Sequence, residues 1–308
     1  MGNIREFKCT YSNSVGISAE TTAGLGLEFP DAYMHSETMQ ILAKAIKAHD
    51  ASDFVLLPFC RTVEAESMGA VLNYGDANTG PRAKDPICAK PDEVLALPDI
   101  DFSRNRIAEV LDTCRSLKQQ GENVCLEVTG PFTILNALME PRLVFKAYRK
   151  DRDKMKEVFE KLGTQLLRYI EEGKKAGVDI FIFSDSAGSL DILGPKFLTN
   201  AVEDFYDPFL RKVSDLIDDS CIFLLCPKFT YAMVDTGHAE FIDHQLEPGI
   251  DFMQALLSMK GKAKIAGQVC IKNVGVKLAH GKFREIKLWL PHDLSLRFRI
   301  TRLYDHCL

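Results

Sequence analysis

The chain lacks the long apolar stretches that hold proteins in membranes. No uninterrupted apolar run approaches the ~20 residues that cross a bilayer, and residues 1–6 contain no apolar core like that of a secretory signal. A basic excess is also missing, because the net charge is −5 at pH 7, whereas a nucleic-acid-binding protein needs a basic face. We therefore expect a cytoplasmic protein that binds neither membranes nor nucleic acids.

Motifs of several well-known enzyme classes are absent as well. The first expected strand, residues 54–57, is not followed by the Gly-x-Gly-x-x-Gly turn that dinucleotide-binding folds carry. The sequence contains no Walker loop, no Gly-x-Ser-x-Gly and no His-Glu-x-x-His. The chemistry must therefore be sought in residues outside these motifs.

The composition is that of an ordinary globular protein, with 46% hydrophobic and 26% charged residues. Nine cysteines without a signal peptide indicate a reducing compartment and thiols rather than disulfides. We expect one domain over residues 1–308, with an N-terminal arm and helix in residues 1–50 and an atypical tail in residues 282–308.

Strands and helices are expected to alternate along most of the chain. Short apolar runs at 54–57, 124–128, 179–183, 221–225 and 264–266 predict strands. The segments between them predict helices at 35–49, 107–119, 132–148, 153–176, 197–216 and 252–259. This alternation predicts an α/β fold, and the repeated strand–helix unit favours a TIM-type (β/α)₈ barrel with its active residues on the loops after the strands.

The end of the chain leaves the closure of that barrel open. Residues 285–290 and 297–304 are two further candidate strands, which brings the count to six or seven rather than eight. The barrel is therefore expected to be incomplete or atypical at its C-terminus, and a doubly wound open sheet is the alternative.

Two cysteines follow expected strands in the same way. Cys226 directly follows the apolar run 221–225, and Cys270 follows the strand expected at 264–266. Thiols at the C-terminal ends of two parallel strands can converge on one pocket, and paired thiolates suit zinc. The alternative is that both are small buried hydrophobic residues.

Other polar residues occupy similar places. Glu127 lies inside an apolar strand, Asp185 follows the strand at 179–183, Lys228 follows Cys226, and Gln268 precedes Cys270. In a barrel these positions share the catalytic face. Each also has an ordinary interpretation: a strand glutamate paired with a basic residue, a helix N-cap, a surface lysine.

A cysteine–histidine hydrolase is a further possibility, with Cys226 as nucleophile and His238 or His244 as base. Both histidines lie in a polar stretch between two expected helices. Nothing in the sequence orients either ring, so a solvated surface histidine is the simpler interpretation.

Four segments together carry a family resemblance. They are residues 26–39, residues 58–75, Gly130-Pro131-Phe132-Thr133, and residues 176–189 with their Ser184-Asp185-Ser186-Ala187-Gly188-Ser189 run. Their order and spacing hold from about residue 25 to about residue 275. The chain resembles the uroporphyrinogen decarboxylase superfamily and, within it, the branch of methylcobamide:thiol methyltransferases of the coenzyme M type.

The resemblance implies a barrel enzyme that moves a methyl group between a methylcorrinoid and a zinc-activated thiol or another one-carbon substrate. It implies zinc as cofactor, with Cys226 and Cys270 as ligands, and a corrinoid supplied by a partner carrier protein. Asp185 and Glu127 are then the expected catalytic residues. Asp31, Tyr33, Lys228 and Gln268 are the expected substrate-binding residues.

The departures from the family pattern define two alternatives. The branch carries His-x-Cys and a distant cysteine, but Leu224 replaces that histidine, and only Cys270 or tail residues such as His306 and Cys307 can replace the distant ligand. A non-catalytic barrel that binds a corrinoid or its carrier is therefore one alternative. A uroporphyrinogen decarboxylase-like enzyme is the other, although the region around Asp31 lacks the paired arginines that a polycarboxylate substrate needs.

Overall fold

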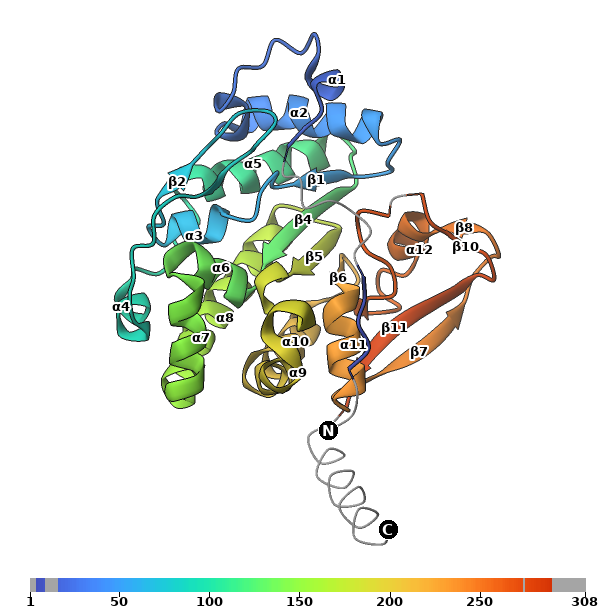
Figure 1. The fold of residues 1–308 in the computed structure, drawn as a ribbon. Helices are drawn as coiled ribbons and strands as arrows, with labels where there is room; N and C mark the ends of the chain where they lie inside the picture. Colours follow the sequence, from blue (N-terminus) through green and yellow to red (C-terminus); the bar gives the residue numbers. More distant parts are fainter. Residues whose placement is uncertain (1–3, 9–15, 274, 290–308) are drawn as a thin grey trace, which may run out of the picture.

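The computed structural model describes residues 4–8, 16–273 and 275–289 (Figure 1). Its strands are β1 (Val55–Leu57), β2 (Leu72–Asn73), β3 (Arg82–Ala83), β4 (Val124–Thr129), β5 (Ile180–Ser184), β6 (Ile222–Leu225), β7 (Ala239–Gln245), β8 (Ile250–Asp251), β9 (Ile265–Ala266), β10 (Lys277–Leu278) and β11 (Lys282–Leu288). The α-helices are α1 (Ala19–Thr22), α2 (Ser36–His49), α3 (Val63–Ser67), α4 (Pro91–Ala96), α5 (Asn105–Gln119), α6 (Pro131–Leu138), α7 (Pro141–Lys150), α8 (Arg152–Lys175), α9 (Leu190–Ala201), α10 (Asp207–Leu216), α11 (Pro227–Asp235) and α12 (Phe252–Ser258). Short 3₁₀ turns are η1 (Asp31–Tyr33) and η2 (Ser186–Gly188), and η3 (Val202–Tyr206) is π-helical.

The main sheet has seven strands in the order β1-β4-β5-β6-β9-β11-β7. The first five are parallel to one another, and β11 runs antiparallel to both of its neighbours. The α/β class with a parallel sheet is therefore confirmed. Among the described residues the strands form this linear order and not the closed eight-stranded barrel that the sequence favours.

The strand order departs from that of a barrel after β6. In a (β/α)₈ barrel, consecutive strands are neighbours, so β7 would lie between β6 and β9. Instead β9 pairs directly with β6, while β7 pairs along its whole length with β11. The antiparallel pair of β7 and β11 stands at the edge of the sheet (Figure 1), and its ladder covers seven residue pairs.

Each face of the parallel sheet is covered by helices. Leu126 of β4 and Phe183 of β5 pack in one apolar cluster with residues of α5, α8 and α10. Ile182 of β5 and Leu224 of β6 belong to a second cluster that includes Phe252 of α12. Because the strands are buried on both sides, their sequences are almost continuously apolar. The face that carries the second cluster is called the inner face.

Three expectations about local structure need correction. The helix expected at 132–148 is two helices, α6 and α7, because Pro141 begins a new one. The helix expected at 197–216 is interrupted by the π-helical turn 202–206. Residues 239–245 form strand β7 rather than a connection between helices. Among the described residues, no helix is long and apolar enough to cross a membrane.

Asp179 ties the N-terminal edge of the parallel strands together. Its side chain is 2% exposed and accepts hydrogen bonds from Lys118 Nζ at 2.8 Å, Lys260 Nζ at 2.6 Å and Val124 N at 3.0 Å. Burial opposes ionisation of this carboxyl, but the two ammonium groups and the amide outweigh it and hold the pKa of Asp179 below its ordinary value. One carboxylate thus joins α5, β4, β5 and the segment after α12.

We expect Asp179→Asn to lower the free energy of unfolding by about 2 kcal/mol at pH 7, because charge-assisted hydrogen bonds are lost. A depressed folded-state pKa stabilises the fold at all pH values above the unfolded-state pKa, and this stabilisation disappears as pH falls through the folded-state pKa. The difference between wild type and variant in urea denaturation should therefore shrink below about pH 4. A difference that grew at acid pH would contradict this role of Asp179.

Candidate active site at the strand ends

The C-terminal ends of β4, β5 and β6 lie side by side. Thr129 pairs with Ser184 across β4 and β5, and Phe183 pairs with Leu225 across β5 and β6. The amide of Cys226 donates to the carbonyl of Phe183 at 3.1 Å, which extends the pairing beyond the strand. The parallel register therefore brings Glu127, Asp185, Cys226 and Gln268 to one edge of the sheet.

Glu127 is paired with an arginine that the sequence analysis did not single out. Arg61, which follows β1, donates from Nε to Glu127 Oε1 at 2.6 Å, and the hydroxyl of Ser184 donates to the same oxygen. The Arg61 side chain is 30% exposed and the Glu127 side chain 11%. Arg61 and Ser184 thus hold the Glu127 carboxylate in place, and the Arg61 guanidinium remains partly accessible to solvent.

Cys226 and Cys270 are both half-buried and lie in the electrostatic surroundings of Arg61. Burial raises the pKa of the Cys226 thiol to about 12, and Cys270 raises it further, whereas the Lys228 amide and the Arg61 guanidinium act in the opposite direction. The charges of Glu127, Cys226 and Cys270 in turn raise the pKa of Arg61. Arg61 and Glu127 therefore form a bonded pair, and the two thiols lie within electrostatic range of Arg61; these four groups are called the cluster below.

The described residues do not complete a catalytic zinc site. Such a site needs three protein ligands and one open position, but no group of three or more His, Cys, Asp and Glu residues suited to a metal occurs in the described part of the chain. Leu224, two residues before Cys226, is 1% exposed and packs in the apolar cluster of the inner face. The tail residues His292, His306 and Cys307 lie outside the described residues.

Asp185 is fully buried, and four donors occupy its carboxylate. Thr133 donates to Oδ1 from its amide and its hydroxyl, both at 2.7 Å, while Phe132 N at 3.1 Å and the Tyr206 hydroxyl at 2.9 Å donate to Oδ2. Burial raises the pKa of Asp185, and these bonds counteract the rise. The carboxylate therefore caps the first turn of the neighbouring helix α6, and its contacts are with the protein itself.

Lys228 and Gln268 also bond to protein groups at the same edge. Lys228 Nζ donates to both oxygens of Asp191 in α9, at 3.0 and 3.2 Å. The side-chain amide of Gln268 donates to the carbonyl of Lys282 at 3.0 Å and accepts from the amide of Arg284. Gln268 thus fastens the end of β9 to β11.

The two remaining substrate-binding candidates lie farther along the N-terminal arm. Asp31 is exposed. Tyr33 is 1% exposed, its hydroxyl donates to the carbonyl of Asp76 at 3.2 Å, and its ring packs edge-on against Phe29. Burial raises the pKa of Tyr33 to about 12. Tyr33 connects to the strand ends through its contact with Phe59, which precedes Arg61 by two residues.

The two histidines considered as bases have other partners. His238 Nδ1 lies 2.9 Å from the Thr236 hydroxyl, and burial lowers the pKa of His238. His244 lies in β7 and contacts Glu285 of β11 at 2.8 Å. Neither ring contacts Cys226 among the described contacts, so the geometry gives the cysteine–histidine hydrolase no support.

Arg61, Ser184 and Glu64 belong to the cluster although none was predicted as a site residue. Glu64 Oε1 accepts a hydrogen bond from Thr129 N at 2.7 Å. Because β1 ends before it reaches Thr129, the Glu64 side chain bonds to the amide that β1 leaves unpaired. Glu64 is 0% exposed and Glu64 Oε2 has no partner in the described structure. Burial, with a contribution from Glu127, raises the pKa of Glu64. The only available signal was that Glu64 and Ser184 lie within the family-like segments.

Comparison with known families decides the classification. The family model of uroporphyrinogen decarboxylase (URO-D) matches residues 18–269, which is most of the chain. The chain belongs to this family. The matched range contains all the candidate residues except Cys270, and it ends before β10 and β11.

The chain is also similar to individual methyltransferases. A methylcobamide:CoM methyltransferase, MtaA, from Methanosarcina barkeri is 24% identical over 249 residues, which cover 80% of this chain and 72% of that protein. The same enzyme from the Fusaro strain is 24% identical over 220 residues, which cover 70% of this chain and 64% of that protein. A methyltransferase of known structure from Methanosarcina mazei has a similar fold, with a TM-score of 0.61, 22% identity, and coverage of 73% of this chain and 68% of that chain.

We expect Leu224→His to increase zinc binding, because it supplies a third ligand two residues before Cys226, the spacing that the sequence lacks. Zinc per chain, measured by plasma emission after dialysis, should rise to about one. Leu224→Asn is the matched control, since it places a polar group of similar size there without an imidazole. The double variant Leu224→His, Cys226→Ser should lose the gain; zinc retained in that variant would show that the metal binds elsewhere.

Proposed function

We propose that this URO-D family protein transfers a methyl group from a methylcobamide, presented by a corrinoid carrier protein, to a small thiol. The observation that carries the proposal is the group of polar residues at the strand ends, where Arg61 is bonded to Glu127 and the Cys226 and Cys270 thiols lie within electrostatic range of Arg61. The similarity to methylcobamide:CoM methyltransferases supports the direction of transfer.

The residues present suit the proton balance of this reaction. The substrate thiol must lose its proton before its sulfur attacks the methyl carbon, and the cobalt–carbon bond then breaks with its electron pair left on cobalt. In this proposal Glu127 accepts the proton, and the bonds from Arg61 and Ser184 fix the position of its carboxylate. The partly exposed guanidinium of Arg61 orients the polar part of the substrate.

Asp185 has a different role in the proposal. Its four donors and complete burial leave it no access to a substrate, so it fixes the loops around the cluster. Lys228, bonded to Asp191, and Gln268, bonded to β11, serve in the same way as supports of the rim. Asp31 remains a proposed substrate contact at the N-terminal arm.

Zinc enters as a separate proposal about Cys226 and Cys270. Two thiols match the donor type that zinc prefers, but they are one ligand short of a catalytic site within the described residues. A third ligand would have to come from residues outside the described ranges or from the substrate thiol itself. The metal content of the purified protein measures this directly.

A second candidate function is favoured by Leu224. An apolar residue at the position of the family's histidine is compatible with a barrel that binds a corrinoid or its carrier without catalysis. Such a protein would bind methylcobalamin but leave its methyl group in place. The two functions therefore differ in product formation and not in binding.

We expect Cys226→Ser to lower methyl transfer from methylcobalamin to a thiol such as coenzyme M by at least about tenfold. The loss of the cobalt–carbon absorption band measures the rate. Cys221→Ser is the matched control, because Cys221 is a buried cysteine just before the opposite end of the same strand. Equal rates for wild type and Cys226→Ser would contradict the proposed role of Cys226 as a zinc ligand in methyl transfer, and binding without any turnover in wild type would establish the second candidate.

A further inference from the structure

The segment Val202–Tyr206 forms one π-helical turn between α9 and α10. Such turns are rare and occur frequently at functional sites. Its two sides have different surroundings: Glu203 and Asp204 contact charged residues of α8, whereas Tyr206 is 0% exposed. The turn therefore stands between the outer helices and the strand ends.

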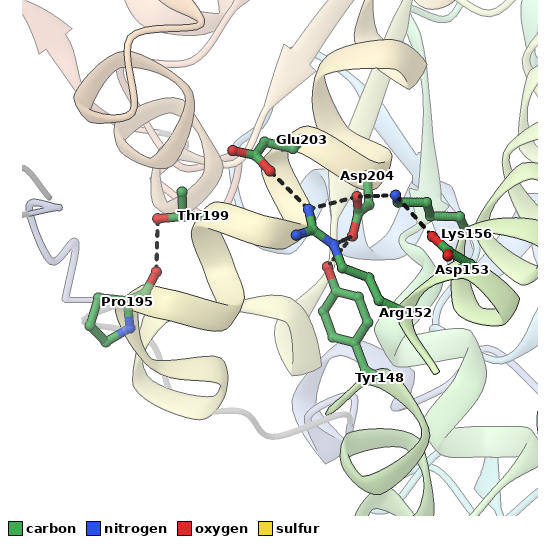
Figure 2. A network of polar contacts seen from close by, with 8 residues as sticks. All are labelled: Tyr148, Arg152, Asp153, Lys156, Pro195, Thr199, Glu203 and Asp204. Atoms are coloured by element: carbon green, nitrogen blue, oxygen red, sulfur yellow. Dashed lines mark hydrogen bonds and ion pairs between the residues drawn. The ribbon is translucent and has the colours of Figure 1, made fainter. Parts of the chain in front are cut away.

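The outer side of the turn is anchored by α8 and the end of α7. Arg152 donates to Asp204 at 2.6 and 2.8 Å and to Glu203 at 2.8 Å, and the hydroxyl of Tyr148 donates to Asp204 at 2.8 Å. Figure 2 shows these side chains converging on Asp204. A groove of about 650 Å³ between α8 and the turn lies on this side. Four hydrogen bonds thus fix the turn without any contact to the candidate site.

The inner side of the turn reaches the end of β5. The Tyr206 hydroxyl donates to Asp185 Oδ2 at 2.9 Å, and two glycines make room for this contact. A Cβ on Gly188 would lie 2.1 Å from the Tyr206 oxygen, and a Cβ on Gly130 would lie 2.3 Å from the Asp185 Cβ. Each distance is far below van der Waals contact, so any side chain at either glycine would displace the pair.

The contact continues from Asp185 to the candidate catalytic group. Asp185 follows Ser184, whose hydroxyl donates to Glu127 and whose carbonyl accepts from Gly130 N at 2.8 Å. Burial raises the pKa of Tyr206, and electrostatic interactions with Asp185 and Cys226 raise it further. The Tyr206 hydroxyl therefore stays protonated and can donate. The Tyr206 hydroxyl therefore bonds to the residue that directly follows Ser184, whose hydroxyl donates to Glu127.

We propose that Tyr206 is a positioning residue for the strand-end site, and that it acts through Asp185 to hold two loop segments: 130–133, the start of α6, and 186–189, which contains the turn η2. Its kinetic consequence rests on the methyl-transfer function proposed above. Its structural consequence, the rigidity of the two loops, does not depend on that function. The two consequences can therefore be tested separately.

The structural test compares Tyr206→Phe with Tyr148→Phe by amide hydrogen exchange. Both tyrosines are almost fully buried and donate to an aspartate, at 2.9 and 2.8 Å, but Tyr148 bonds to Asp204 on the outer side, where Arg152 still holds that residue. We expect exchange in 130–133 and 186–189 to become about tenfold faster in Tyr206→Phe only. Exchange within about twofold of wild type in both loops of Tyr206→Phe would overturn the proposal.

The kinetic test uses the same variants and the substrates of the methyl-transfer assay. We expect Tyr206→Phe to lower kcat by about tenfold with KM within about threefold, because the groups that react are misplaced while binding contacts remain. Tyr148→Phe should keep both constants near wild type. A Tyr206→Phe enzyme with unchanged kcat would contradict the role in positioning even if the loops exchanged faster.

Gly188→Ala supplies an independent variant. Its Cβ should displace the Tyr206 hydroxyl and reproduce the faster exchange of the two loops, and combination with Tyr206→Phe should cost no more than the larger single effect. Because that Cβ would also lie 2.8 Å from Asp185 Oδ2, Gly188→Ala should disturb both partners of the bond, and unchanged exchange in both segments of Gly188→Ala would contradict the proposal. If wild type shows no methyl transfer, the proposed function fails, while the exchange measurements still decide the role of Tyr206.

Discussion

The parallel register of β4, β5 and β6 is the constraint on which the candidate site depends. Because Thr129 pairs with Ser184 and Phe183 with Leu225, the chain leaves all three strands at the same level. The side chains of Glu127 and Ser184 can then share a hydrogen bond, and Cys226 follows at the end of the third strand. A shift of one residue in any strand would turn its polar group to the opposite face of the sheet.

Three carboxyl groups at this edge, those of Glu127, Asp185 and Glu64, differ in their environments. Glu127 has a guanidinium partner and stays accessible through Arg61. Asp185 is buried, and hydrogen bonds to four donors replace a cation. Glu64 is buried with one amide donor, and burial raises its pKa. Environments that separate the behaviour of neighbouring carboxyl groups are typical of catalytic sites, and of these three only Glu127 has a partly exposed cationic partner.

Local patterns predicted much of the framework. The apolar runs found the five parallel strands, and the strand-to-loop positions brought Glu127, Asp185, Cys226 and Gln268 to one edge. What could not be predicted depends on contacts between distant residues. Nothing near Asp185 in the sequence shows that Thr133 and Tyr206 fill its carboxylate. Arg61 became part of the site only through its bond to Glu127, 66 residues away.

The strand order beyond β9 also depends on contacts between distant residues, which the sequence does not show. The strand predicted at 285–290 overlaps β11 (Lys282–Leu288), but its sequence does not show which strands it pairs with. The ladder between β7 and β11 covers seven residue pairs and separates β7 from β6. β7 lies within residues 18–269, which match the family model, whereas its partner β11 lies beyond them. The strand ends of β4, β5 and β6 keep their arrangement regardless of that change.

The central claim is that the strand ends form the surface that meets the corrinoid. Hydrogen exchange of the wild-type protein with and without saturating methylcobalamin tests it most directly, since it locates binding without any substitution. The account predicts slower exchange in the segments after β4, β5 and β6, namely 129–133, 184–189 and 226–230, and no change around Asp179 at the opposite edge. Protection confined to the Asp179 edge or to the outer helices would contradict it.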